Sequence, residues 1–95
     1  MTIKAEKCLI YTGDSPVKAR VNIVLDDMFI IKGVKIIDGK QGMFIAMPDY
    51  YNRTHGVFRD VCHPMNNDCR IAMQEAALAA YDDALAQLEG EGEGE

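Results

Sequence analysis

The clearest pattern of hydrophobic and polar positions lies between Val17 and Leu25. Every second residue of this segment is apolar, and Lys18, Arg20 and Asn22 stand between the apolar positions. Because successive side chains of a strand point to opposite faces, this alternation predicts a half-buried strand of an antiparallel sheet. One face of that sheet is expected to be apolar and the other to be polar and exposed.

The residues on either side of this strand carry weaker patterns that predict further strands. β-Branched residues fill Met28–Ile37, but the apolar phase slips at Lys32-Gly33, which predicts a β-bulge. The glycine-bracketed segment Asp38–Gly42 predicts a hairpin loop. The remaining predicted elements are strands at Ile3–Tyr11, Met43–Met47 and Val57–His63, and a displayed loop at Asp49–Gly56.

The C-terminal part of the chain predicts a single helix. Asn66, Asn67 and Asp68 supply helix-capping side chains, and strong helix formers follow from Asp68 to Leu88. One apolar stripe is expected to lie on the sheet. Its members are Ile71, Leu78 and Leu85, spaced every seven residues, with Gln74, Tyr81 and Leu88 beside them.

The predicted fold class is α+β: an antiparallel sheet of four to five strands, followed by one C-terminal helix. Residues 1–88 are expected to form one domain. Residues 89–95 alternate Glu with Gly and predict a disordered acidic tail. Such a tail could solubilise the protein, compete with nucleic acid for basic side chains, or contact another protein.

Charge is distributed unevenly along the chain, and this changes the meaning of the net charge of −5. Residues 1–74 hold ten Lys/Arg against eight Asp/Glu, a balance of +2, whereas residues 75–95 hold seven Asp/Glu and no Lys/Arg. The sheet region is therefore mildly basic and the C-terminal region strongly acidic, which is a weak indication of an anionic partner.

Composition favours a cytoplasmic protein without a cofactor. The N-terminal segment has neither the apolar core of a signal peptide nor a run long enough to span a membrane. Three cysteines (Cys8, Cys62 and Cys69) indicate reduced thiols and not a disulfide framework. A zinc site from these and the two histidines would need spacings that match no common ligand pattern, and no nucleophile–base pair is visible, so neither a metal nor catalysis is predicted.

The candidate binding residues gather around the segment Pro48–Pro64. Arginines bind phosphate through two parallel hydrogen bonds, and a tyrosine ring can stack on an unpaired base. Each has a purely structural alternative: Arg59 could pair with Asp60, and the tyrosines could pack on the sheet edge or in a dimer interface. The candidate nucleic-acid-binding residues are Lys40, Tyr50, Tyr51, Arg53, Arg59 and Arg70.

Three stretches of the chain resemble the stage V sporulation protein G (SpoVG) or septation-protein family. They are Val34–Gly39, then Gly42–Pro48 with the sequence GMFIAMP, and Phe58–Asn66 with the sequence FRDVCHPMN, followed by Arg70. The resemblance covers roughly residues 3 to 85. Members commonly carry Lys-Arg just after the Met-Pro, where this chain has Tyr50 and Tyr51 in a slightly longer loop.

The resemblance implies a homodimeric bacterial protein that binds DNA, and in some cases RNA, and regulates sporulation, septation or gene expression. It implies no enzymatic activity, no cofactor and no membrane association. The alternative is a non-enzymatic protein-interaction module on the same scaffold, in which Tyr50 and Tyr51 mark a partner surface and nucleic-acid binding is reduced or lost.

Overall fold

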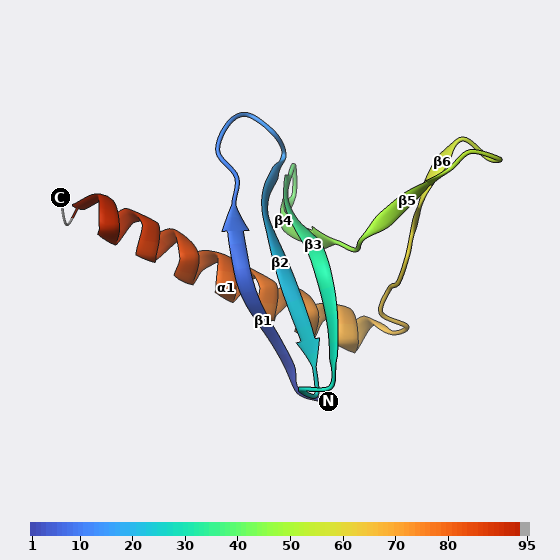
Figure 1. Ribbon diagram of the computed structural model, residues 1–95, viewed down its shortest axis with the longest axis horizontal. Helices are drawn as coiled ribbons and strands as arrows, with labels where there is room; N and C mark the ends of the chain where they lie inside the picture. Colours follow the sequence, from blue (N-terminus) through green and yellow to red (C-terminus); the bar gives the residue numbers. More distant parts are fainter. Residues whose placement is uncertain (94–95) are drawn as a thin grey trace.

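The protein consists of six strands and one helix, as shown by a computed structural model that describes residues 1–93 (Figure 1). The side chains are described through Leu88. The elements are β1 (Ile3–Ile10), β2 (Val17–Leu25), β3 (Phe29–Gly39), β4 (Gly42–Ala46), β5 (Asp49–Asn52), β6 (Val57–Asp60) and α1 (Asn67–Glu93). The α+β class is confirmed.

The first four strands form an antiparallel sheet in the order β1-β2-β3-β4, and α1 crosses one of its faces (Figure 1). The core lies between the sheet and α1. Its buried members are Ala19, Val21, Ile23, Val34, Ile36, Ile45, Met47, Met73 and Ala77. The predicted alternation of β2 is confirmed, because Ala19, Val21 and Ile23 all point to this core. No helix within residues 1–93 is long and apolar enough to cross a bilayer.

The predicted bulge in β3 is confirmed at Gly33. The pairing of β2 with β3 shifts register between Val21 and Ile23, and Gly33 adopts φ +78°. The Gly33 N–H donates to Oδ1 of Asn22 at 3.3 Å, which satisfies a group that the ladder leaves unpaired. The bulge restores the phase, so Val34 and the residues after it continue to fill the core face.

A second bulge lies in β1 and was not predicted. Glu6 pairs with Asn22 and Leu9 with Arg20, so two residues, Lys7 and Cys8, oppose the single position between them on β2. Lys7 takes a left-handed conformation, φ 53°, that side chains other than glycine seldom adopt. The extra residue keeps Cys8 turned toward the core and leaves Lys7 exposed.

The cap of α1 is confirmed, and its predicted apolar stripe is partly right, because Leu78 and Tyr81 pack against the core whereas Ile71 and Leu88 are exposed. Oδ1 of Asn66 accepts the Cys69 N–H at 2.8 Å, as an N-cap side chain should. The helix buries Met73 (2% exposed) and Ala77, whereas Ile71 is 49% exposed. Small alanines allow α1 to approach the sheet closely on the Met73 side, and they carry no signal in a search for large apolar residues. Leu78 and Tyr81 flank the true contact, and Leu88 is exposed.

The helix continues past its predicted end at Leu88 and reaches Glu93. The acidic tail, expected to be disordered from residue 89, is therefore helical through residue 93. Its last two residues lie outside the described part of the chain.

Replacement of Met73 by Ala should lower the free energy of unfolding by about 2 kcal/mol or more, because it removes a fully buried side chain from the sheet–helix contact. Replacement of Ile71 by Ala, on the exposed side of the same helix, should cost less than about 1 kcal/mol. Urea unfolding followed by circular dichroism compares the two. Equal losses would contradict the packing of α1 through Met73.

Candidate functional site

The second sheet is a β-hairpin that projects from the body of the molecule (Figure 1). We call residues 49–60, which comprise β5, β6 and the turn between them, the arm. Within the described elements, β5 and β6 make substantial contact only with one another. The predicted displayed loop at Asp49–Gly56 is therefore half strand, and the predicted strand Val57–His63 ends at Asp60. The tyrosines and Phe58, which are β-formers, let the two segments pair.

The turn of the arm is fixed by Asn52. Its Oδ1 accepts the N–H groups of Thr54 and His55 at 3.0 and 3.3 Å, and its carbonyl accepts the Gly56 N–H at 2.8 Å. Gly56 has φ +67°, a conformation that glycine adopts without strain. These bonds place Arg53 at the tip of the arm.

The two faces of the arm carry different chemistry. Tyr50 and Arg59 are cross-strand partners, so both side chains lie on the same face of the arm. Tyr51 pairs with Phe58 on the other, and their rings meet edge to face with centroids 5.2 Å apart. Tyr50, Tyr51 and Phe58 are 49%, 52% and 69% exposed, so neither face is covered.

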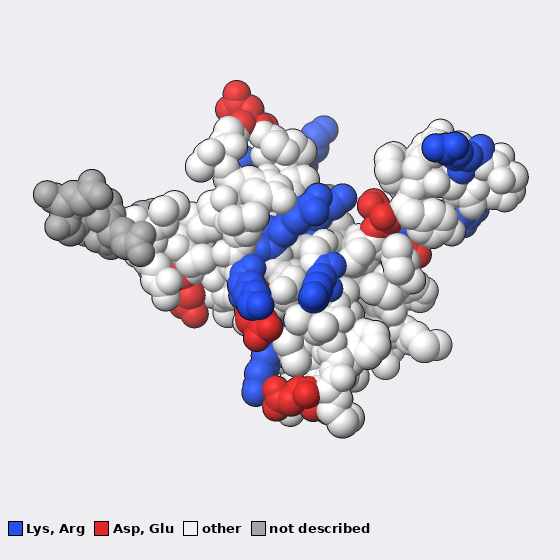
Figure 2. Space-filling view, in the orientation of Figure 1, with Lys and Arg blue, Asp and Glu red and all other residues white. Residues whose placement is uncertain are grey.

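Charge divides the arm into a basic tip and an acidic base (Figure 2). Asp49 and Asp60 are cross-strand partners at the base, and Nζ of Lys35 lies 3.6 Å from Oδ1 of Asp49. In the described part of the chain, Arg53 and Arg59 form no ion pair, so the alternative pairing of Arg59 with Asp60 is not seen. Both guanidinium groups are available to an anion.

The other two candidate residues lie apart from the arm. Lys40 occupies the tight turn between β3 and β4, and Arg70 lies in the first turn of α1 (Figure 1). The structure thus brings Tyr50, Tyr51, Arg53 and Arg59 together on one hairpin, while Lys40 and Arg70 belong to separate parts of the surface.

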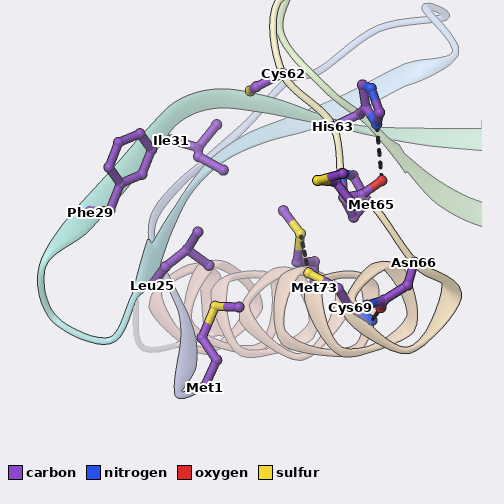
Figure 3. Close-up of a pocket in the computed structure, with 11 residues that line it drawn as sticks. Met1, Leu25, Phe29, Ile31, Cys62, His63, Met65, Asn66, Cys69 and Met73 are labelled. Atoms are coloured by element: carbon purple, nitrogen blue, oxygen red, sulfur yellow. Dashed lines mark hydrogen bonds between the residues drawn. The ribbon is translucent and has the colours of Figure 1, made fainter.

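A cavity of about 390 Å³ opens between the end of the β2–β3 hairpin and the start of α1 (Figure 3). Its lining is apolar and rich in sulfur, and includes Met1, Phe29, Met65, Cys69 and Met73. Nδ1 of His63 lies 3.0 Å from the Pro64 carbonyl, so this ring supports the turn into α1. The lining offers packing surface but few polar groups to orient a ligand.

The thiols and histidines form no recognisable reactive centre. Burial raises the pKa of the Cys8 thiol, which makes it a poorer nucleophile. Among residues 1–93, no three His, Cys, Asp or Glu side chains converge in a way that could hold a metal ion.

The candidate set based on sequence leaves out the cations on the sheet face opposite α1. The alternation of polar and apolar residues in β2 placed Lys18 and Arg20 on a polar face. This pattern could have indicated that they are candidate binding residues. Only the pairing of strands shows that Lys35 lies directly opposite Arg20.

Comparison with known proteins identifies the family. A family model for SpoVG matches residues 1–83. The chain is 42% identical over 73 residues to a protein of Macrococcus caseolyticus, and this match covers 77% of the chain and 63% of the relative. It is 40% identical over 78 residues to a protein of Clostridioides difficile, covering 82% of the chain and 84% of the relative. Both relatives carry the name "Putative septation protein SpoVG".

This chain therefore belongs to the SpoVG family. The family resemblance expected from Gly42–Pro48 and Phe58–Asn66 is confirmed. The matched stretch spans less than two thirds of the Macrococcus relative.

Replacement of Phe58 by Ala should loosen the arm without unfolding the sheet, because it removes an edge-to-face pair worth about 0.5–1.5 kcal/mol from a hairpin with little other support. Amide hydrogen exchange should accelerate at residues 50–59 and remain unchanged in β2 and β3. Faster exchange that spreads to the core strands would contradict the independence of the arm.

Proposed function

We propose that this protein is a homodimeric, non-enzymatic regulator of the sporulation and septation type that binds nucleic acid in the bacterial cytoplasm. The observation that carries the proposal is the arm, an exposed hairpin that carries Arg53 at its tip and Arg59 beside Tyr50 nearer its base. It needs no cofactor, because phosphate contacts and base stacking require only these side chains.

The chemistry of the arm suits a nucleic-acid strand. Guanidinium groups bind phosphate oxygens with two parallel hydrogen bonds, and phosphate neutralisation supplies most of the non-specific affinity. The exposed ring of Tyr50 lies beside Arg59, so stacking on a base and contact with a neighbouring phosphate can occur together. Members of the family commonly carry a Lys-Arg pair where this chain has Tyr50 and Tyr51. Base stacking by these tyrosines partly replaces the charge of that pair. DNA and RNA are both suitable ligands for such a surface.

The exposure of the arm supports the proposed dimer. An isolated two-stranded hairpin is marginally stable in water, and this one leaves Tyr51 and Phe58 uncovered. A second copy would cover apolar surface and present two basic tips related by two-fold symmetry, which suits a paired nucleic-acid site.

The same exposed rings favour a second candidate function, a protein-interaction module. Tyr50, Tyr51 and Phe58 form the kind of aromatic surface that is enriched in protein interfaces. In this alternative the arm binds a protein partner, and the association weakens little with salt.

The double replacement of Arg53 and Arg59 by Gln should weaken binding to single-stranded oligonucleotides and lower the salt slope by about 1.4, because each lost phosphate contact removes about 0.7. Fluorescence anisotropy with labelled DNA and RNA strands and duplex DNA, at several salt concentrations, measures both quantities. The matched control is Ala79→Glu with Ala86→Glu, which changes the net charge equally on exposed positions of α1.

The control should bind nearly as the parent does. A folded parent protein that binds none of these ligands at low salt would overturn the proposal and favour the protein-interaction module. Light scattering of the purified protein should give the mass of a dimer, and a monomer at all concentrations would contradict the homodimer.

A further inference from the structure

The four-stranded sheet has one covered and one uncovered face. α1 packs against β1, β2 and β4 on the side of Met73 and Ala77. No element of residues 1–93 covers the other side, and Figure 2 shows Lys and Arg side chains gathered over the front of the sheet. Basic side chains thus gather on this broad surface, next to some acidic ones, as well as on the tip of the arm.

The backbone pattern turns these cations to the uncovered face. On β2, Arg20 stands between the buried Ala19 and Val21 and therefore points away from α1, while Lys18 occupies a register shift between Val17 and Ala19. On β3, Lys35 stands between the buried Val34 and Ile36, so it points to the same side of the sheet as Arg20, its cross-strand partner. We call the resulting set the sheet-face cations: Lys7, Lys18, Arg20, Lys32 and Lys35.

The central pair of this set is electrostatically unfavourable in the free protein. Arg20 and Lys35 are direct cross-strand partners, and like charges in that position destabilise a sheet. Arg20 lies 5.9 Å from the centre of the Tyr11 ring, and Lys35 contacts Asp49. In the described part of the chain, Lys7, Lys18, Arg20 and Lys32 have no carboxylate partner. A bound anion would relieve this repulsion.

The sheet that carries these cations is joined to the base of the arm, where Asp49 and Asp60 lie. The ion pair between Lys35 and Asp49 joins β3 to the base of the arm, and β4 leads into β5 through Pro48. Exposed acidic residues of α1, including Glu75 and Asp82, lie on the element that covers the opposite face. This difference in charge between the two sides of the molecule favours binding of an anionic strand on the sheet side and disfavours binding on the α1 side.

We propose that the sheet-face cations form a second nucleic-acid contact surface, which binds the phosphate backbone of the same strand that the arm holds. This inference rests on the proposed function and extends its site from the arm to the sheet. Lys18 and Arg20 are about 7 Å apart along β2, and neighbouring strands add cations at intervals of about 5 Å. A flat array of this kind contacts several phosphates without reading a sequence.

The double variant Lys18→Gln, Arg20→Gln tests the surface, with Ala79→Glu, Ala86→Glu as the control of equal net charge and Arg53→Gln, Arg59→Gln as the arm variant. We expect the sheet-face variant to bind a labelled single-stranded oligonucleotide about tenfold more weakly at low salt, with a salt slope reduced by about 1.4. The control should change affinity less than about threefold, since its charges lie on the far side of α1. Circular dichroism and urea unfolding verify that each variant is folded.

The outcomes separate the two proposals. Loss of affinity in the arm variant, with the sheet-face variant equal to the control, overturns this inference and leaves the proposed function standing. A parent protein that does not bind overturns both. If Lys18→Gln, Arg20→Gln fails to fold, Lys7→Gln, Lys32→Gln removes two cations from the flanking strands, and an affinity equal to the control again overturns the inference.

Discussion

The fold depends on keeping the core side chains of neighbouring strands on the one face of the sheet that α1 covers. β2 sets this phase, because its alternate residues from Ala19 to Ile23 are buried against α1. Its neighbours would lose the phase without their bulges, since a shift of one residue turns a whole strand over. The bulge at Gly33 keeps Val34 inward, and the bulge at Lys7 keeps Cys8 inward.

The same constraint produces the surface that we associate with function. The register that returns Val34 and Ile36 to the core leaves Lys35 on the opposite side of the sheet, directly beside Arg20. Lys7, in the bulge of β1, occupies a left-handed backbone conformation and is exposed. The register in which the strands pair thus determines both the packing of the core and the position of the surface charges. The sheet lies between the basic face and α1 with its acidic side chains.

Periodicity predicted the strands because their signal is local. The alternation of β2 and the glycine at the phase slip in β3 depend only on neighbouring residues, and both features were predicted correctly. The helix stripe was predicted only in part, because Leu78 and Tyr81 pack against the core but the most deeply buried contacts are Met73 and Ala77, whose burial is decided by the approach of the sheet and not by side-chain size. The bulge in β1 was missed because Lys7 gives no glycine signal.

The candidate site was partly accessible from sequence. Tyr50, Tyr51, Arg53 and Arg59 were identified as neighbours because they are close in the chain, and the hairpin keeps them together. Lys40 and Arg70 are close to the arm in the sequence, but in the fold they lie on other elements. Lys40 lies in the turn between β3 and β4, and Arg70 lies in the first turn of α1. The opposition of Arg20 and Lys35 depends on strand pairing across fifteen positions of the chain, which no local pattern encodes.

The most direct test of the account is a two-dimensional NMR titration of the isotopically labelled protein with a single-stranded oligonucleotide at low salt. The account predicts shifts of the backbone amides of Arg53 and Arg59 on the arm and of Lys18 and Arg20 on the sheet, with Ala79 and Ala86 of α1 unchanged. Shifts confined to α1, or no shifts at saturating oligonucleotide, would contradict it.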